Sequence, residues 1–198
     1  LPSAVCTDCH TSHAVLKHTD ERSSVNAHNL PATCANCHKG IYNEFITSIH
    51  FSNEKKKMDK LPSCANCHSA HQISSVKKDA FMLEVTEQCG ECHTELAESY
   101  FETMHGKAYQ LGFTGSAKCS DCHGAHNILP SSNPNSTIGL THIVETCQNC
   151  HEDANARFTG YLTHATHHDP DKYPILHYTW LAMTTLLISV FTFFGIHT

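Results

Sequence analysis

The sequence predicts a mostly irregular, all-α fold built from three copies of one repeat and followed by a single transmembrane helix. Three observations support this prediction. Twelve cysteines occur in a chain of 198 residues, all of them in C-x-x-C pairs. The spacing between these pairs recurs along the chain. Residues 174–198 form an apolar stretch without Asp, Glu, Lys or Arg.

The composition leaves little apolar material for an ordinary core. Hydrophobic residues make up 40% of the chain, and part of that share lies in the C-terminal stretch. A small domain with a poor core needs covalent or metal help to fold. The formal net charge of −6, without a basic face, argues against nucleic acid as a partner. The chain begins at Leu1, which we expect to be a mature N-terminus left by removal of an export signal.

Each cysteine pair is followed at once by a histidine, which gives six C-x-x-C-H motifs. This is the attachment signature of c-type haem, in which two thioethers hold the porphyrin and the histidine binds the iron. A disulfide framework, structural zinc or a redox dithiol also uses paired cysteines, but none of them requires six adjacent histidines. We therefore expect six covalent c-type haems. The cysteines are Cys6, Cys9, Cys34, Cys37, Cys64, Cys67, Cys89, Cys92, Cys119, Cys122, Cys147 and Cys150, and the proximal histidines are His10, His38, His68, His93, His123 and His151.

The motifs alternate in type, which defines a two-haem repeat. The first, third and fifth motifs, here called the odd motifs, carry a second histidine three residues after the first. First cysteines two motifs apart are separated by 55 or 58 residues throughout. This recurrence indicates three copies of an odd–even haem pair. We expect a haem-organised cytochrome c domain over residues 1–168, and a linker and transmembrane helix over residues 169–198.

The second, fourth and sixth motifs, here called the even motifs, run into a helical pattern. Apolar residues recur three, seven and eleven positions after each proximal histidine, which places them on one face of a helix. We expect this face to pack against haem. The three rows are Ile41, Phe45 and Ile49; Leu96, Tyr100 and Met104; and Ala154, Phe158 and Leu162.

Recurrence at fixed offsets also selects the candidate distal iron ligands. One set is the second histidine of each odd motif, and we expect it to bind the iron of the following even haem. The other set stands twelve residues after an even proximal histidine, and we expect it to bind the iron of the following odd haem. The first set is His13, His71 and His126, and the second set is His50 and His105.

The pattern is irregular at both ends of the repeat array. In the third repeat the helix-end histidine stands one position later, at His164, with His167 and His168 as alternatives. The first haem has no preceding helix to supply a ligand, which leaves His18, His28, the same C-terminal group, an open site or another chain. No methionine recurs at a ligand offset. We therefore expect low-potential bis-histidine haems, because methionine ligation raises the potential.

The strings "YFETMHGKAY", "CSDCHGAHNI" and "CGECH" resemble the exported multihaem c-type cytochromes with doubled C-x-x-C-H motifs. The similarity covers about residues 1–168. It implies bis-histidine haems arranged as an electron-transfer chain.

The C-terminal stretch "PILHYTWLAMTTLLISVFTFFGI", residues 174–196, exceeds the roughly 20 apolar residues that cross a bilayer core. Because c-type haem is attached after export, we expect the haem domain on the periplasmic, outer side of the cytoplasmic membrane. The string "FTFFGIHT" resembles the first helix of membrane b-type cytochrome domains fused to multihaem cytochromes. This resemblance implies a b-type haem ligand at His177 or His197 and a natural chain that continues past Thr198. A histidine at the membrane interface without a ligand role is the alternative.

These resemblances imply a membrane-anchored hexahaem cytochrome c that relays electrons and has no catalytic residue of its own. Its expected partners are membrane lipid, a quinol-oxidising b-type cytochrome or other membrane oxidoreductase subunit, and redox proteins in the periplasm or beyond. Two alternatives stay open. A multihaem reductase of nitrite, hydroxylamine or sulfite needs one haem with an open site. The membrane segment argues against the other alternative, a subunit of an extracellular cytochrome assembly.

Overall fold

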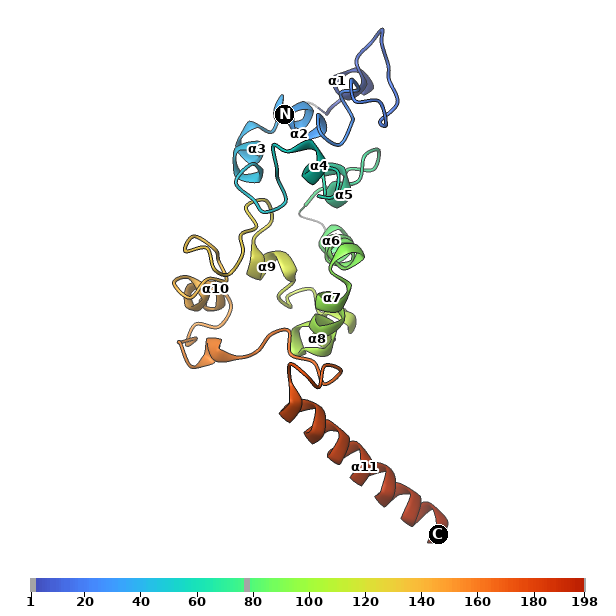
Figure 1. Ribbon diagram of the computed structural model, residues 1–198, viewed down its shortest axis with the longest axis vertical. Helices are drawn as coiled ribbons and strands as arrows, with labels where there is room; N and C mark the ends of the chain where they lie inside the picture. The colour runs from blue at the N-terminus through green and yellow to red at the C-terminus, as the bar shows by residue number, and fades with distance from the viewer. Residues whose placement is uncertain (1–2, 77–78, 198) are drawn as a thin grey trace. The chain divides into compact units, whose positions relative to one another are not determined.

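The computed structural model describes residues 3–76 and 79–197. Over these residues the chain forms short helices joined by long loops, and no strand (Figure 1). The predicted all-α, irregular character is therefore confirmed. The elements are α1 (Cys6–His10), α2 (Leu30–Ala35), α3 (Lys39–Phe45), α4 (Lys55–Met58), α5 (Cys64–His68), α6 (Asp79–Cys92), α7 (Thr94–Glu102), α8 (Met104–Gln110), α9 (Cys119–His123), α10 (Ile143–Gln148), the 3₁₀ turn η1 (Phe158–Gly160) and α11 (Pro174–His197).

The chain divides into two compact units, and each unit combines two segments that are distant in sequence. Unit 1 contains all twelve cysteines and five complete motifs, because the histidine of the fourth motif, His93, belongs to unit 2. Unit 2 contains α7, α8 and α11. The segments are Leu1–Cys92 with Ala117–Gly160 in unit 1, and His93–Ser116 with Tyr161–Thr198 in unit 2.

Hydrogen bonds join the two segments of unit 1. The amide of Ile49 donates to the carbonyl oxygen of Ile128 at 2.8 Å, and Ser48 Oγ donates to the same oxygen at 3.2 Å. Thr47 Oγ1 adds a bond of 3.1 Å to Asn127 Oδ1. The loop after α3 is therefore fixed beside the loop after α9, within reach of the fifth motif.

Two of the three helices predicted after the even motifs are shorter than their apolar rows indicate. α3 ends at Phe45, so His50 lies in a turn rather than at a helix end. α7 ends at Glu102, because Thr103 is extended and its hydroxyl accepts from the Gly106 amide at 3.2 Å as the cap of α8. His105 consequently lies in the first turn of α8, not at the end of one continuous helix.

The third predicted helix, after His151, is wrong. The chain forms turns there and the single 3₁₀ turn η1. Asn155 Oδ1 accepts from the backbone amides of Arg157 and Phe158 at 3.0 and 3.2 Å. Such a local side-chain bond offers the backbone an alternative to helix hydrogen bonds, and it overrides the apolar spacing here.

The polypeptide buries few of its own apolar side chains. In the predicted apolar rows only Tyr100 and Ala154 are buried, while Met104 and Leu162 are 81% and 63% exposed. Contiguous exposed apolar surface favours contact with another apolar group, as expected for a domain organised around cofactors. In the part of the chain that the structure describes, the buried apolar residues are Met58, Phe81, Tyr100, Tyr109 and Ala154.

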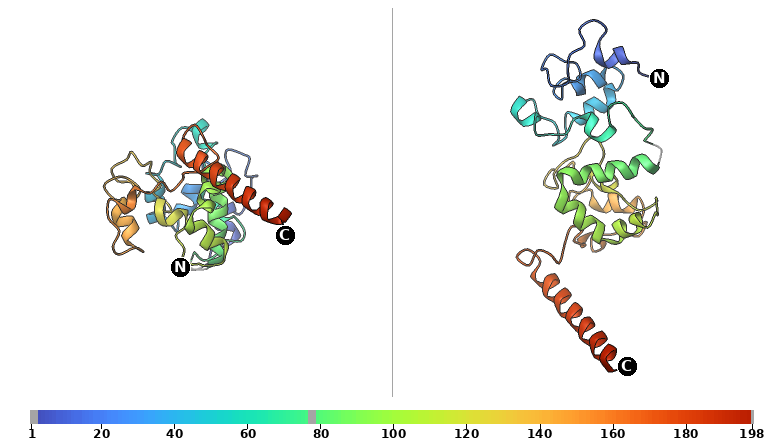
Figure 2. Two further views of the ribbon diagram at one scale, coloured as in Figure 1. Left: turned by 90° about the horizontal axis from the view of Figure 1, so that it is seen from below. Right: turned by 90° about the vertical axis from the view of Figure 1, so that its right-hand side faces the viewer.

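The C-terminal helix α11 is much longer than any other helix (Figures 1 and 2). It has 24 residues, and its most apolar window of 18 residues has a mean hydropathy of 1.8 and no buried residue. At 1.5 Å per residue the helix is about 36 Å long, which exceeds the roughly 30 Å of a hydrocarbon core. It begins at Pro174, a residue favoured at the first helical position. The helix is therefore long and apolar enough to cross a membrane.

Candidate haem-binding sites

All twelve cysteines are free thiols, so none is engaged in a disulfide. Attachment of a c-type haem needs two thiols and a neighbouring histidine at each site. The six C-x-x-C-H motifs meet that requirement in the folded chain. The donor set therefore fits the cofactor, which supplies reversible one-electron chemistry at its iron when bound.

The three odd motifs form helices of one turn, α1, α5 and α9. In each, the residue before the first cysteine donates its backbone N–H to the side chain of the residue before the second cysteine, at 2.8 Å. This reciprocal bond is half of a capping box and starts the helix at the first cysteine. The donors are Val5, Ser63 and Lys118, and the acceptors are Asp8, Asn66 and Asp121.

A left-handed residue ends each odd motif directly after the proximal histidine. Thr11 and Ser69 have φ of 63° and 58°, and Gly124 occupies the same position with φ of 78°. This conformation turns the chain out of the helix. The second histidine of the motif, two residues later, therefore leaves the face on which the proximal histidine lies.

The even motifs are built differently, because each stands at the end of a longer helix. α2, α6 and α10 end within the motif or at its second cysteine. His38 and His93 then occupy the N-cap positions of α3 and α7 with non-helical backbone angles. These proximal histidines thus lie at the junction of two helices.

Cysteines of successive motifs lie close together when an even motif is followed by an odd one. The Cys64 thiol donates to the Cys34 sulfur, and the Cys119 thiol donates to the Cys89 sulfur. These bonds lower the pKa of Cys34 and of Cys89 to about 7, and they raise the pKa of the donor thiols. The same contact therefore recurs in two successive copies of the even–odd step.

A different contact recurs where an odd motif is followed by an even one. Burial raises the pKa of the second cysteine of each odd motif, and the nearby cysteines of the next motif raise it further. Every motif thus has its sequence neighbours as spatial neighbours. The contacts are Cys9 with Cys34 and Cys37, Cys67 with Cys89 and Cys92, and Cys122 with Cys147 and Cys150.

Two pairs of imidazoles lie parallel at the same separation. The rings of His10 and His71 are 6.0 Å apart with 12° between their planes, and those of His68 and His126 are 6.0 Å apart with 15°. A metal–imidazole bond is about 2.0 Å, so two imidazoles on opposite sides of one metal have ring centres about 6 Å apart. The spacing in both pairs would allow the two imidazoles to hold one iron between them.

This pairing differs from the expected one. His71 and His126 were expected to face the even motif that follows each of them, yet each lies opposite the proximal histidine of the preceding odd motif. Both contacts join residues of successive repeats, and the spacing of the histidines within one motif does not reveal such contacts.

His68 has an environment that keeps its ring neutral. Burial lowers its pKa first, and the neighbouring His126 and His38 lower it further. His126 Nδ1 also lies 4.0 Å from the Glu44 carboxylate. A ligating imidazole must be neutral, and a carboxylate near its other nitrogen fixes its orientation.

The other predicted distal ligands occupy distinct places. His13 is exposed, and His50 is half-buried in the turn after α3. The carbonyl of His105 accepts from Ser116 Oγ at 2.6 Å within unit 2. His164 is half-buried, and its Nδ1 lies 2.9 Å from Ser99 Oγ.

His164 and two histidines of α11, His177 and His197, each form a hydrogen bond through Nδ1. Ser99 Oγ donates to a carbonyl, so its oxygen accepts from His164 Nδ1–H. His177 Nδ1 donates to the carbonyl of His167 at 2.7 Å, and His197 Nδ1 donates to that of Phe193 at 2.9 Å. In neutral His177 and His197 rings, Nε2 therefore carries the lone pair, which is the form that binds a haem iron.

One group of polar residues was missed by the sequence analysis. Glu102 lies beside His167 and His168 in unit 2, although 65 residues separate it from the nearer histidine. Glu102 is one of three glutamates in α7, and nothing in the local sequence marks it as the partner of these histidines. Only the fold brings these three side chains together.

Comparison with known proteins identifies two relatives, both from Shewanella baltica. The multiheme cytochrome MtrA is 27% identical over 136 residues, which cover 67% of this chain and 35% of MtrA. The multiheme cytochrome MtrC is 27% identical over 124 residues, which cover 61% of this chain and 17% of MtrC. The chain thus spans about a third or less of the length of these relatives.

No protein-family profile matches the chain, and no solved structure matches it significantly. The chain is nevertheless similar to multihaem c-type cytochromes, and its twelve cysteines fit such cofactors. This similarity supports a role in electron transport.

Proposed function

We propose that this chain is a hexahaem c-type cytochrome that relays electrons along a row of covalent haems. The observation that carries the proposal is the pair of parallel imidazole couples, each with a ring separation of 6.0 Å. The same ring separation at equivalent positions of two successive repeats is expected if each pair binds one iron. The similarity to multihaem cytochromes supports the same function.

The proposal assigns both axial ligands at two haems. His10 and His71 bind the iron of the haem on Cys6, and His68 and His126 bind that of the haem on Cys64. Each odd haem is thereby completed by the next repeat. This assignment supports three two-haem repeats within a cytochrome domain over residues 1–168, because the cysteine contacts alternate with the same period.

An electron relay needs neighbouring cofactors and closed iron sites. The cysteines of successive motifs are neighbours along the whole series, so the porphyrins attached to them are close as well. Two histidine ligands leave no coordination position for a substrate. The remaining predicted ligands His13, His50 and His105 complete other haems in this proposal.

The proposal places the chain at the cytoplasmic membrane. α11 crosses the bilayer, and the haem domain lies on its periplasmic side. His177 and His197 present Nε2 for a b-type haem, since a backbone carbonyl holds the other nitrogen of each ring. A quinol-oxidising b-type cytochrome or another membrane oxidoreductase subunit is then the membrane partner, and periplasmic or extracellular redox proteins exchange electrons with the haems.

Spectroscopy of the purified holoprotein tests this function. We expect a pyridine haemochrome assay on denatured protein to return six covalent haems per chain. Low-temperature EPR of the oxidised protein should contain low-spin signals alone. Markedly fewer than six covalent haems would refute the hexahaem relay, and a high-spin signal from one iron in the unmodified protein would favour a reductase with an open site.

A further inference from the structure

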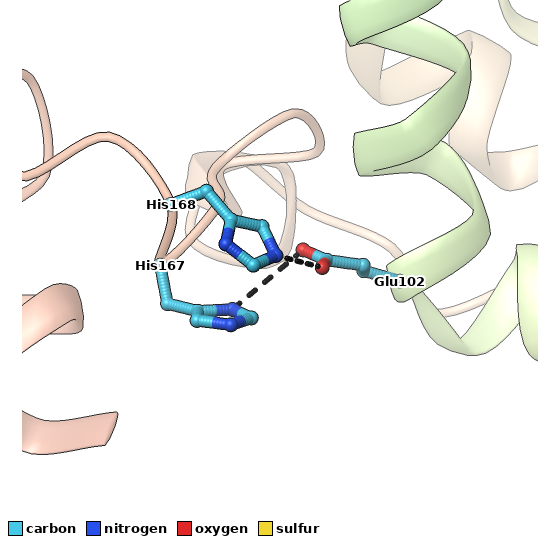
Figure 3. A group of neighbouring side chains, drawn as sticks. All are labelled: Glu102, His167 and His168. Atoms are coloured by element: carbon cyan, nitrogen blue, oxygen red, sulfur yellow. Dashed lines mark ion pairs between the residues drawn. The ribbon is translucent and has the colours of Figure 1, made fainter. Parts of the chain in front are cut away.

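Glu102, His167 and His168 form a compact group of metal-ligating side chains in unit 2 (Figure 3). Glu102 is the last residue of α7, and the histidines lie in the segment before α11. His168 Nε2 is 3.2 Å from Glu102 Oε1, and His167 Nδ1 is 3.8 Å from Glu102 Oε2. One carboxylate thus faces two imidazoles that come from adjacent residues.

The spacing of the three donor atoms fits a single tetrahedral ion. Donors bound at about 2.1 Å with tetrahedral angles lie about 3.4 Å apart. The separations of the two imidazoles from the carboxylate, 3.2 Å to Oε1 and 3.8 Å to Oε2, lie on either side of that value. All three donor atoms are within 4.8 Å of one another. An ion needs only small side-chain adjustments to reach all three.

Surrounding contacts hold the group in place. Thr166 Oγ1 donates to Glu102 Oε2 at 3.1 Å and so orients the carboxylate. The His167 ring stacks on Trp180 with 4.3 Å between ring centres. The His167 carbonyl accepts from His177 Nδ1 at 2.7 Å, which ties the same segment to the first turn of α11. Outer contacts of this kind are what orient metal ligands in proteins.

We propose that Glu102, His167 and His168 bind a divalent transition-metal ion of the Zn²⁺ class, separate from the haem irons. Two imidazoles and one carboxylate suit Zn²⁺, Co²⁺ or Ni²⁺, whereas Ca²⁺ and Mg²⁺ take oxygen ligands alone. Three protein ligands leave a fourth position for water. A cavity of about 400 Å³ lined by Thr103, Tyr161 and Leu176, besides Glu102 and His167, has room for that water.

The bound ion would fasten the segment that leads into α11 to the end of α7. Glu102 and His168 are partly open to water, so an ion would strengthen a contact that hydrogen bonds and ion pairs already form. The ion would therefore fix the exit of the chain toward α11. It would also be redox-inactive if it is zinc, so its effect is on structure rather than on electron flow.

Equilibrium dialysis of the detergent-purified holoprotein against Zn²⁺, after treatment with a chelator, tests the site. We expect one tightly bound zinc per chain by elemental analysis and a higher melting temperature in its presence. Glu102→Gln and His168→Ala should each weaken binding by about tenfold or more, and the double variant His167→Ala/His168→Ala should abolish it. Asp59→Asn is the matched control, since it removes the carboxylate of an isolated pair with His28 at 3.1 Å.

The proposal would be overturned if the unmodified protein bound no zinc. It would also be overturned if the Glu102→Gln and Asp59→Asn variants bound zinc equally well. A new high-spin haem signal in the His167→Ala or His168→Ala variant would overturn it too, because the imidazole would then belong to a haem iron. The covalent haem count is measured on the same samples. It separates failure of this site from failure of the proposed electron relay, because a zinc result leaves that count unchanged.

Discussion

Thr11, Ser69 and Gly124 hold one backbone conformation at three equivalent positions. Their φ values are 63°, 58° and 78°, and their ψ values are 174°, 177° and 169°. An L side chain rarely adopts this region, and a non-glycine residue there costs of order 1–3 kcal/mol. Two repeats thus keep a strained residue, and the third has the residue that relieves the strain. The conformation is retained because it directs the second histidine of each odd motif.

Replacing Ser69 with glycine should stabilise the holoprotein. We expect an increase of about 1 kcal/mol in the free energy of unfolding, because glycine adopts this φ without strain. The Ser69 hydroxyl is also buried and has no hydrogen-bond partner among the described residues, so its loss is not costly. Denaturant unfolding followed by haem absorbance measures the change.

Ser12→Gly serves as the control, because Ser12 is not among the positive-φ residues and glycine there only adds chain entropy to the unfolded state. Gly124→Ala is the reverse change and should destabilise by about 1 kcal/mol. Steric overlap is not its cause, since an added Cβ would meet only Asn127 O at 3.4 Å. A Ser69→Gly protein that is less stable than Ser12→Gly would contradict the strain argument.

His164 should make stability depend on pH in a defined direction. Burial lowers its pKa in the folded protein below the ordinary value of 6.5. Between the lowered pKa and 6.5 the unfolded state therefore binds more protons than the folded state, and stability falls as pH decreases through that window. Comparing unfolding at pH 7.5 with that at pH 5.5 should give a smaller loss for His164→Gln than for the unmodified chain. An identical loss in both proteins would exclude His164 as the source.

At the scale of elements, the two motif types have different structural roles. An odd motif is a helix of its own, started by its own side chain and ended by a left-handed residue. An even motif stands at the end of a helix, and the histidines of the first two even motifs, His38 and His93, occupy the N-cap position of the helix that follows. The odd motif can therefore direct an imidazole toward another repeat, while the even motif joins two helices within one repeat.

Removal of His71 should leave a free coordination position on the iron of the haem attached at Cys6. We expect His71→Ala to retain six covalent haems, because thioethers do not depend on the distal ligand. One iron of the six should become high-spin in the EPR spectrum and gain a higher potential, since one imidazole ligand is lost. His28→Ala is the control, because His28 pairs with Asp59 and lies at no recurring offset.

A second background identifies which iron His71 binds. In a Cys6→Ala/Cys9→Ala protein the first haem is missing, so His71→Ala should add no further high-spin signal. If the signal appears in that background as well, His71 binds a different haem, such as the following even one. The same pair of experiments with His126 and the haem on Cys64 should give the same pattern, because the two imidazole couples have the same geometry.

At the scale of the whole molecule, the residue types at each motif and the helical character could be predicted from the sequence. The contacts between histidines of different repeats could not. The C-x-x-C-H motifs, the all-α character and the apolar segment that forms α11 follow from local sequence, because each depends on residues a few positions apart. The pairing of His71 with His10 joins residues of different repeats, so local sequence does not reveal it. The absent helix after His151 depends on one asparagine that competes with the apolar spacing.

The long helix α11 is apolar enough to anchor the molecule in a membrane, and this proposed role can be tested by charge. It holds no Asp, Glu, Lys or Arg over 24 residues, so it has no internal obstacle to insertion. An arginine at the centre of a transmembrane helix costs about 2.5–3.5 kcal/mol on insertion scales. We therefore expect the double variant Leu186→Arg/Leu187→Arg to move covalent haem from the carbonate-washed membrane fraction into the soluble periplasmic fraction.

The control places the same charge outside α11. Leu140→Arg alters a loop residue that is 96% exposed, and its haem should stay with the membranes as in the unmodified protein. Haem staining of both fractions measures the distribution, and the haem count per chain shows that each variant still matures. If the double variant remains wholly in the washed membranes, α11 is not the element that anchors the molecule, because two central arginines would have removed its preference for the bilayer.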